Sequence, residues 1–220
     1  NEIEVQGDYG IDAYDCDFSR IDSNVVRGYD DGVEYGIRAH ESAFVNIEYN
    51  DIQDFREHGI YFQSSANAVV NHNRVIGADN GTYKYGIYNG ASNQYAKVNH
   101  NYVELLDNTY NSYWSSEHLR QGIVAHDSEV IGDSVFVNAG NGYHSYCTGI
   151  IAHRSTVSDN FVRVTDYSSS TASTAIESMG DGAPRHTVTN NTIEAMDDVR
   201  GIWASHADIE ENYMSNGTVT

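Results

Sequence analysis

The 220-residue sequence predicts a single all-β domain over residues 1–220, a solenoid of about eight coils with three strands each. Three observations predict this fold. A Gly-Ile pair recurs along the chain, a six-residue pattern follows each pair, and the composition is rich in turn formers, with 19 Gly, 21 Asn and one Pro. Gly and Asn both adopt the left-handed backbone of tight turns.

The Gly-Ile pairs divide the chain into units of roughly 26 residues, and we expect coils to begin near residues 10, 36, 59, 86, 122, 149, 175 and 201. In the seventh pair Ala175 replaces Gly. The second pattern is an aliphatic residue, two polar residues, Asn or Asp, any residue and an apolar residue. It begins at Ile21, Ile47, Val70, Val98, Val130, Val157, Val188 and Ile209. One unit cannot bury its own apolar side chains, whereas stacked units form a continuous core.

Each unit has room for three short strands whose side chains point alternately inward and outward. Stacking in register places equivalent residues above one another. The inward column that follows each glycine should contain Ile11, Ile37, Ile60, Ile87, Ile123, Ile150, Ile176 and Ile202. Two residues further on, a column of mostly small residues should contain Ala13, Ala39, Ala125, Ala152 and Ala204. These two columns predict the core of the first sheet.

Two polar columns are expected inside the turns. The first contains Asn24, Asn50, Asn73, Asn101, Asn160, Asn191 and Asn212, with Asp133 in place of Asn in the fifth repeat. Their amides can form hydrogen bonds along the stack. The second contains Cys16, Ser42, Ser65, Ser92, Ser128 and Ser155, so Cys16 is expected to replace a serine. Five coils separate Cys16 from Cys147, roughly 20 Å, so both should be unpaired.

This pattern of repeats resembles the right-handed parallel β-helix of the pectate-lyase-like superfamily, with its asparagine ladder, over residues 9–220. That superfamily includes polysaccharide lyases, pectin-type hydrolases, alginate epimerases, viral tailspikes and surface adhesins, and the fold does not choose among them. The resemblance implies that a substrate lies along the outer face of the first sheet. For a lyase, it also implies a Lys or Arg base, often with Ca²⁺ held by clustered acids.

The outer face of the first sheet carries the candidate glycan site. The residues two positions after each glycine are expected to point outward, and they include Arg38, Tyr61 and Tyr88. Aromatic rings beside a guanidinium suit an acidic sugar, since the rings stack on the sugar and the guanidinium pairs with its carboxylate. Arg38 is therefore a candidate catalytic residue, and Tyr61 and Tyr88 are candidate glycan-binding residues. An ordinary solvated surface is the alternative.

A second group of polar residues lies further along the chain. His126, Asp127 and His153 occupy equivalent places on adjacent coils and are further catalytic candidates, because an imidazole can act as a base. A polar column produced by the repeat is the alternative. The adjacent acids Asp30 and Asp31 are candidate Ca²⁺ ligands, and no other cofactor is expected.

The fourth unit is the longest, at 36 residues, and its excess lies around LLDNTYNSYWSSEHLR. A long loop on a rigid solenoid is a usual place for binding residues. Tyr113 and Trp114 in this insertion are therefore candidate glycan-binding residues, with a contact to a neighbouring subunit or a passive loop as alternatives.

Charge excludes some functions. The net charge of −20 opposes binding to nucleic acid, and no run of 18 apolar residues could span a membrane. With 10 Arg against 2 Lys, the composition also predicts a protein of concentrated salt, with an ordinary acidic secreted protein as the alternative.

The chain shows no motif of the hydrolase or epimerase type and no amphipathic cap at its ends. The expected function is therefore a non-enzymatic surface or structural module of a cell envelope or virion. Such a module would associate with copies of itself or with neighbouring domains and contact glycans. The alternative is a polysaccharide lyase or epimerase that acts on an acidic glycan along the Gly-Ile face.

Overall fold

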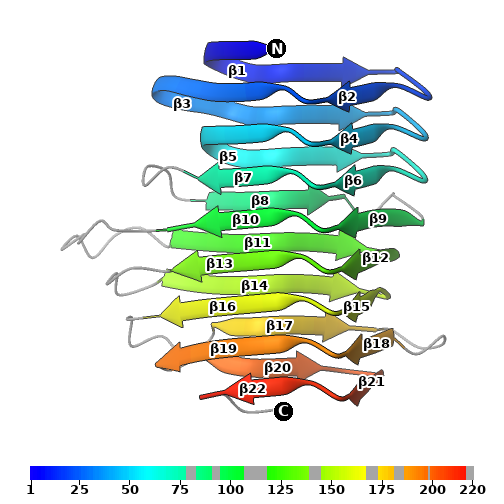
Figure 1. Cartoon of the computed structure of the whole chain (residues 1–220), viewed down its shortest axis with the longest axis vertical. Coiled ribbons are helices and arrows are strands. Elements are labelled where there is room, and N and C mark those ends of the chain that lie inside the picture. The colour runs from blue at the N-terminus through cyan, green and yellow to red at the C-terminus, as the bar shows by residue number, and fades with distance from the viewer. Residues whose placement is uncertain are drawn as a thin grey trace.

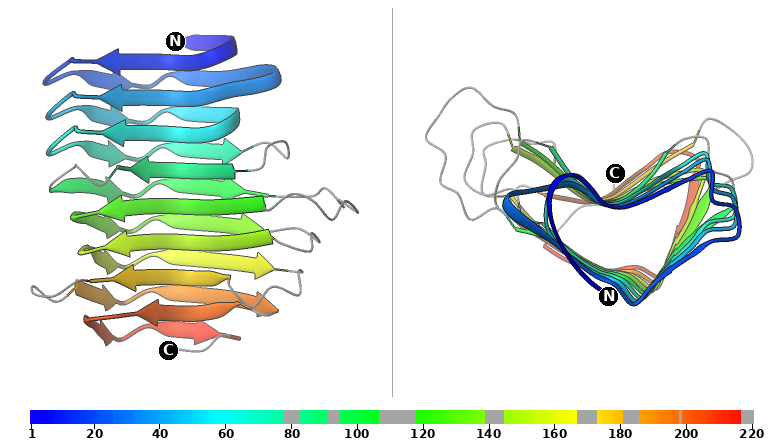
Figure 2. Two further views of the ribbon diagram at one scale, coloured as in Figure 1. Left: turned by 180° about the vertical axis from the view of Figure 1, so that it is seen from behind. Right: turned by 90° about the horizontal axis from the view of Figure 1, so that it is seen from above.

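The computed structural model describes residues 1–77, 83–90, 95–106, 118–138, 145–166, 173–180, 186–197 and 199–216, without the side chains of residues 30, 31, 118 and 145. These residues form a single right-handed parallel β-helix (Figure 1). Within the described ranges no helix is long and apolar enough to cross a membrane. Viewed along the stack, the coils superimpose and enclose the core (Figure 2).

Each repeat contributes strands to three faces, and all neighbouring strands are parallel. The first face carries the Gly-Ile pairs on β1 (Glu2–Tyr14), β3 (Val25–His40), β5 (Asp51–Gln63), β8 (Tyr83–Asn89), β11 (His118–His126), β14 (Ser145–His153), β17 (Thr174–Met179) and β20 (Arg200–Ala204). The second face consists of β2 (Arg20–Asp22), β4 (Asn46–Glu48), β6 (Val69–Asn71), β9 (Ala96–Asn99), β12 (Ser128–Ile131), β15 (Thr156–Ser158), β18 (His186–Thr189) and β21 (Ala207–Glu210).

The third face follows the asparagine turn. It contains β7 (Arg74–Gly77), β10 (Tyr102–Leu105), β13 (Ser134–Asn138), β16 (Phe161–Asp166), β19 (Thr192–Asp197) and β22 (Tyr213–Ser215). The first halves of β1, β3 and β5 also belong to it, because these long strands run through the corner onto the first face without a break.

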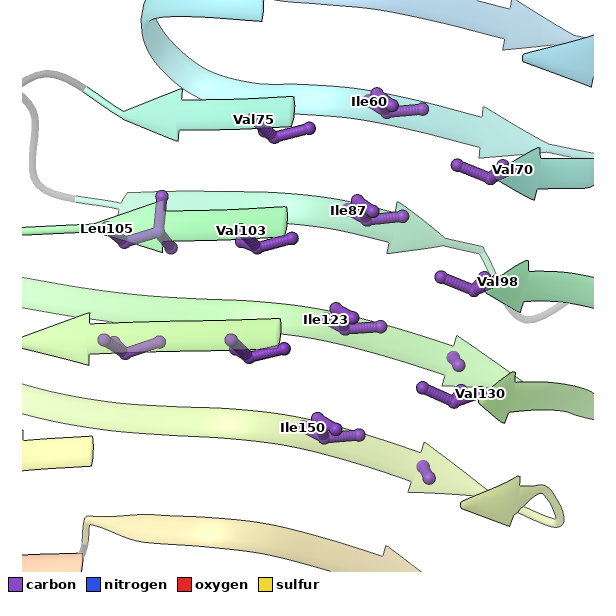
Figure 3. Packing of buried hydrophobic residues seen from close by; sticks show 14 of the residues in the cluster. Ile60, Val70, Val75, Ile87, Val98, Val103, Leu105, Ile123, Val130 and Ile150 are labelled. Carbon is purple, nitrogen blue, oxygen red and sulfur yellow. The ribbon is translucent and has the colours of Figure 1, made fainter. Parts of the chain in front are cut away.

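The predicted register is confirmed. The eight isoleucines from Ile11 to Ile202 lie on adjacent strands of the first face, one above the other. Ile37, Ile60 and Ile87 have no exposed surface. Figure 3 shows this column beside the valine columns of the second and third faces, which include Val98 and Val103. The alternation of inward and outward side chains therefore holds from repeat to repeat.

The repeated glycine is explained by the close approach of the third face. A Cβ atom added to Gly86 would lie 2.3 Å from Cγ1 of Val103 and 2.6 Å from the carbonyl oxygen of Gly122. Both distances are too short for real contacts. The same crowding occurs at Gly36 and Gly149. Glycine is thus required by the packing of two sheets at this corner, while its backbone stays in the ordinary strand conformation.

The asparagine column forms a hydrogen-bonded ladder. The side-chain amide of Asn24 donates to Oδ1 of Asn50 at 3.0 Å, and Asn50 donates to Oδ1 of Asn73 at 3.0 Å. From Asn50 onward, each buried amide also donates to a carbonyl of the preceding repeat, as Asn50 does to Ile21 at 2.9 Å. The ladder begins one rung earlier than the sequence pattern indicated, because Asn1 donates to Oδ1 of Asn24 at 2.9 Å.

Asp133 changes the chemistry of one rung. Its Oδ1 accepts the backbone N–H of Asn101 at 2.6 Å and the side-chain amide of Asn101 at 2.9 Å, as an asparagine Oδ1 would. Its Oδ2 therefore occupies the place of the amide nitrogen, which in other rungs faces two acceptor oxygens. Oδ2 is buried and has no hydrogen-bond partner that could donate to it. Burial raises the pKa of Asp133 well above its usual value. We therefore expect the carboxyl to be protonated in the folded protein, with Oδ2 in the donor role of the amide.

Both cysteines are present as thiols and are not joined in a disulfide, as predicted. The backbone N–H of Cys16 donates to Oγ of Ser42 at 3.0 Å, and the backbone N–H of Ser42 donates to Oγ of Ser65 at 3.2 Å, so Cys16 belongs to the serine column. Ser92, predicted for the same column, lies outside the described residues. Cys147 is buried and donates to the backbone carbonyl of Thr165 at 3.6 Å.

Candidate functional site

The first face of coils one to four carries two columns of aromatic side chains, which we call the aromatic face. The first column consists of the residue before each glycine, and the second of the residue two positions after it. The members are Tyr9, Tyr35, His58 and Tyr85 in the first column and Tyr61 and Tyr88 in the second. Strands β1, β3, β5 and β8 are neighbours in the sheet, so successive rings of a column lie one strand apart.

The two columns meet in a herringbone. His58 stacks between Tyr35 and Tyr85, with ring centroids 4.9 and 4.7 Å apart. Tyr61 and Tyr88 are parallel to each other within 4°, but their planes lie at 80° and 84° to His58. Parallel rings approach no closer than about 3.5 Å, so the 5.5 Å between the centroids of Tyr61 and Tyr88 limits their sideways offset to about 4 Å at most. Both residues are half-buried, so part of each ring stays exposed.

A cavity of about 330 Å³ opens between the columns, lined by Glu57, His58, Tyr61, Tyr83, Tyr85 and Tyr88. His58 is 8% exposed, and burial lowers its pKa to about 4, so the imidazole is neutral at physiological pH. Its Nδ1 has no hydrogen-bond partner. Burial and the neighbouring Glu34 raise the pKa of Glu57. The cavity thus combines aromatic rings with one carboxyl group, and no cation lines it.

Arg38 lies on this face as predicted, but its guanidinium is already paired. Nε and Nη2 donate to the two carboxylate oxygens of Asp12 at 2.8 and 2.7 Å. Nη1 donates to the hydroxyl of Tyr9 at 2.8 Å, and the guanidinium carbon lies 4.0 Å from the centre of the Tyr9 ring. The two guanidinium nitrogens that we expected to bind a sugar carboxylate therefore bind Asp12 instead.

The candidates His126, Asp127 and His153 are brought together, but outside the aromatic face: His126 ends β11, His153 ends β14, and Asp127 lies in the turn after β11. The imidazoles of His126 and His153 stack 4.6 Å apart, and burial lowers the pKa of both. Asp127 accepts two hydrogen bonds from Arg154, and these hold its pKa below the usual value. These residues thus form a polar column in which Asp127 is paired with Arg154. Neither imidazole lies in the aromatic cavity.

Two predictions about the site concern side chains that the structure does not describe. The side chains of Asp30 and Asp31, the candidate Ca²⁺ ligands, lie outside the described part of the structure, as do Tyr113 and Trp114 of the long insertion. Among the side chains that the structure does describe, no group of three or more His, Cys, Asp or Glu is placed to hold a metal ion.

Sequence analysis missed the first aromatic column, because we considered only the residues that follow each glycine. The signal is nonetheless visible: the residue before glycine is aromatic in the first four Gly-Ile pairs, as Tyr9, Tyr35, His58 and Tyr85. The four later pairs have Gln121, Thr148, Thr174 and Arg200 at this place. The aromatic face is thus a local feature of the N-terminal half of the solenoid.

Comparisons with known proteins agree with this fold. The family described as "Right handed beta helix region" matches residues 1–105. No curated protein matches the sequence. A solved structure of a double mutant of the periplasmic alginate epimerase AlgG is similar with a TM-score of 0.58 and 15% identity, covering 97% of this chain and 48% of that chain.

Two other solved structures are more distant. The Streptococcus pneumoniae surface protein and adhesin PfbA has a TM-score of 0.39 and 11% identity, covering 93% of this chain and 48% of that chain. The alginate lyase from Paenibacillus sp. str. FPU-7 has a TM-score of 0.30 and 13% identity, covering 99% of this chain and 90% of that chain. The chain spans about half the length of the epimerase and the adhesin. The family match and the epimerase structure confirm the resemblance in fold, a right-handed parallel β-helix.

Proposed function

We propose that the chain is a non-enzymatic surface module that binds a polysaccharide along its aromatic face. The observation that carries this proposal is the herringbone of aromatic rings on one face of a rigid solenoid, beside an open cavity that is lined by His58, Tyr61, Tyr85 and Tyr88. Aromatic rings with uncovered faces and polar edges are suited to sugars, whose rings have apolar C–H faces and hydroxyl rims. A cell-envelope or extracellular location is part of this proposal, and it is supported by the periplasmic description of the epimerase structure.

The charges of the aromatic face favour a neutral glycan over an acidic one. Glu57 lines the cavity, Arg56 lies beside it and pairs with Glu34 at 3.9 Å, and the guanidinium of Arg38 is paired with Asp12. The chain as a whole carries a net charge of −20. A polymer of uronic acids would therefore meet a carboxyl group in the cavity and guanidinium groups that are already paired with acids. A neutral sugar chain meets no such repulsion.

The alternative, a lyase or epimerase acting on an acidic glycan, rests on His58. This imidazole lies in the cavity with an unbonded Nδ1 and can accept a proton. A general base works best when its pKa is near the operating pH, and a pKa of about 4 makes His58 a weak base at pH 7. Binding without turnover is therefore the better-supported function.

Removing both rings of the second column is expected to abolish polysaccharide binding. The variant Tyr61→Ala/Tyr88→Ala should lose roughly 100-fold in affinity for the best-bound polysaccharide, because two stacking contacts are lost together. Affinity electrophoresis against cellulose derivatives, xylan, mannan, alginate and pectate measures this loss and shows whether neutral polymers bind more tightly.

Trp203→Ala is the matched control, since Trp203 points outward from the same column on β20, far from the aromatic cavity. Unchanged retention of every polymer by the double variant would refute the proposal. Unsaturated product from alginate or pectate, lost on His58→Ala, would instead establish the lyase.

A further inference from the structure

A second recess lies at the corner between the first and second faces. The sequence across this corner is short in the fifth and sixth repeats, where five positions separate Ala125 from Val130 and Ala152 from Val157, and equally short in the eighth. The register-equivalent stretches span nine positions in the fourth repeat and ten in the seventh. A groove of about 770 Å³ lies over the short turns of the fifth and sixth repeats. We call it the corner groove.

The floor of the corner groove is built by the turn residues Asp127 and Arg154. Nε and Nη2 of Arg154 donate to the two carboxylate oxygens of Asp127 at 2.7 and 2.6 Å. Both residues adopt positive φ, 49° and 50°, and they occupy equivalent positions in adjacent turns, one rung apart. The two hydrogen bonds hold the guanidinium of Arg154 and the carboxylate of Asp127 in one plane. A carboxylate has about four acceptor sites, so Asp127 can still accept hydrogen bonds from a ligand.

The rim of the groove adds an aromatic ring and a second ion pair. The backbone N–H of Tyr95 donates to the carbonyl of Asp127 at 2.9 Å, which places Tyr95 one rung before the floor, and the residue is 74% exposed. Nζ of Lys97 lies 3.4 Å from Oε2 of Glu129 on the neighbouring strand. All four residues line the groove.

The charges of the corner groove balance. Lys97 and Arg154 offset Asp127 and Glu129, although the whole chain carries −20. A charge-balanced recess with one planar Arg–Asp pair, one Lys–Glu ion pair and an exposed ring suits a neutral molecule with many hydroxyl groups. Hydroxyls can donate to carboxylates and accept from guanidinium and ammonium groups, while the phenol ring contacts an apolar sugar face. The volume is in the range of sites that hold small ligands.

We infer that the corner groove is a second carbohydrate site, which takes a short neutral oligosaccharide independently of the aromatic face. The inference shares its ligand class with the proposed function, but it depends on different residues on a different face. Two sites on one rigid solenoid would let the chain hold two segments of the same polymer. Binding to a polymer would then exceed binding to an oligosaccharide through the raised effective concentration at the second site.

Saturation-transfer NMR with cellohexaose, xylohexaose, mannohexaose and maltohexaose tests the inference. At least one of these probes should bind the wild-type chain and the Tyr61→Ala/Tyr88→Ala variant alike. Its affinity should fall roughly tenfold in Tyr95→Ala and in Asp127→Asn, because each loses a direct contact to the sugar. Phe18→Ala is the control for Tyr95, since Phe18 occupies the equivalent turn position with φ of 57° and is 77% exposed. Arg163→Ala, which removes an exposed ion pair with Glu194 on the third face, controls for loss of a surface charge pair.

The outcomes separate the two sites. Binding that persists in the aromatic-face variant and falls in the groove variants supports the inference, whatever the fate of the proposed function. Binding that is lost only in Tyr61→Ala/Tyr88→Ala supports the aromatic face and overturns the corner groove. The inference is also overturned if none of the four probes binds, or if Phe18→Ala weakens binding as much as Tyr95→Ala does.

Discussion

Replacing Asp133 with asparagine is expected to stabilise the protein increasingly as the pH rises. In the folded wild type, the Asp133 carboxyl is buried and protonated, whereas in the unfolded chain it ionises above a pKa of about 4. Folding therefore takes up a proton between these two pKa values. Over this range the Asp133 contribution to the free energy of unfolding falls by about 1.4 kcal/mol for each pH unit. An asparagine amide restores the rung without a proton.

Urea denaturation of both proteins from pH 4 to pH 8 measures this difference. The two stabilities should be close at pH 4 and diverge in favour of the asparagine variant at higher pH. Asp159→Asn is the matched control, because Asp159 is exposed and precedes the ladder residue Asn160. It removes one acid near the ladder without changing a rung. Parallel curves for Asp133→Asn and the wild type would show that the buried carboxyl is ionised in the folded state.

Replacing Gly86 with valine is expected to prevent stable folding. The first added carbon would lie 2.3 Å from a methyl of Val103, which has no exposed surface, and 2.6 Å from the carbonyl oxygen of the next strand. Neither neighbour can move without disturbing another coil. Overpacking of this kind costs about 1–3 kcal/mol for small additions and more for larger ones. Because Ala175 occupies the equivalent place in the seventh repeat, Gly86→Ala should fold with a cost within that range.

Circular dichroism melting of the two Gly86 variants measures the effect. Gly90→Ala is the control, because a Cβ atom there would meet the flexible side chain of Gln63 at 2.9 Å, which can move aside. The expected order of stability is wild type, Gly90→Ala, Gly86→Ala and Gly86→Val. A Gly86→Val protein that melts within a few degrees of the wild type would show that the two sheets can separate at this corner.

The core was predictable from the sequence because it depends on two periods alone, the length of the repeat and the two-residue alternation of a strand. The repeat places Ile60 above Ile37, and the strand period of two places both inside, whatever the other side chains do. Asp133 was recognisable as a replacement for asparagine in the same way. Its protonation was not, since this depends on which acceptors its second oxygen faces and on the exclusion of water, and both arise only when the coils stack.

The site was predictable only in part, for a similar reason. The outward position of Tyr61, Tyr88 and Arg38 follows from the period of two and is confirmed. The pairing of Arg38 with Asp12 depends on a side-chain conformation across one rung, which the sequence pattern does not determine. The corner groove depends on a difference in length between neighbouring turns, and we compared the spacings of the Gly-Ile pairs but not those of individual corners.

The three corners of the coil differ in how much their length varies, and this has an evolutionary consequence. The asparagine corner has the same six-residue pattern in all eight repeats, because one inserted residue would break the ladder. The corner before the Gly-Ile pair ranges from seven positions, between Ile52 and Gly59, to nineteen, between Val103 and Gly122. Insertions at this corner leave the stacking unchanged. A lineage of such proteins can therefore acquire new surface loops by duplication and insertion at the variable corners while it inherits the ladder corner intact.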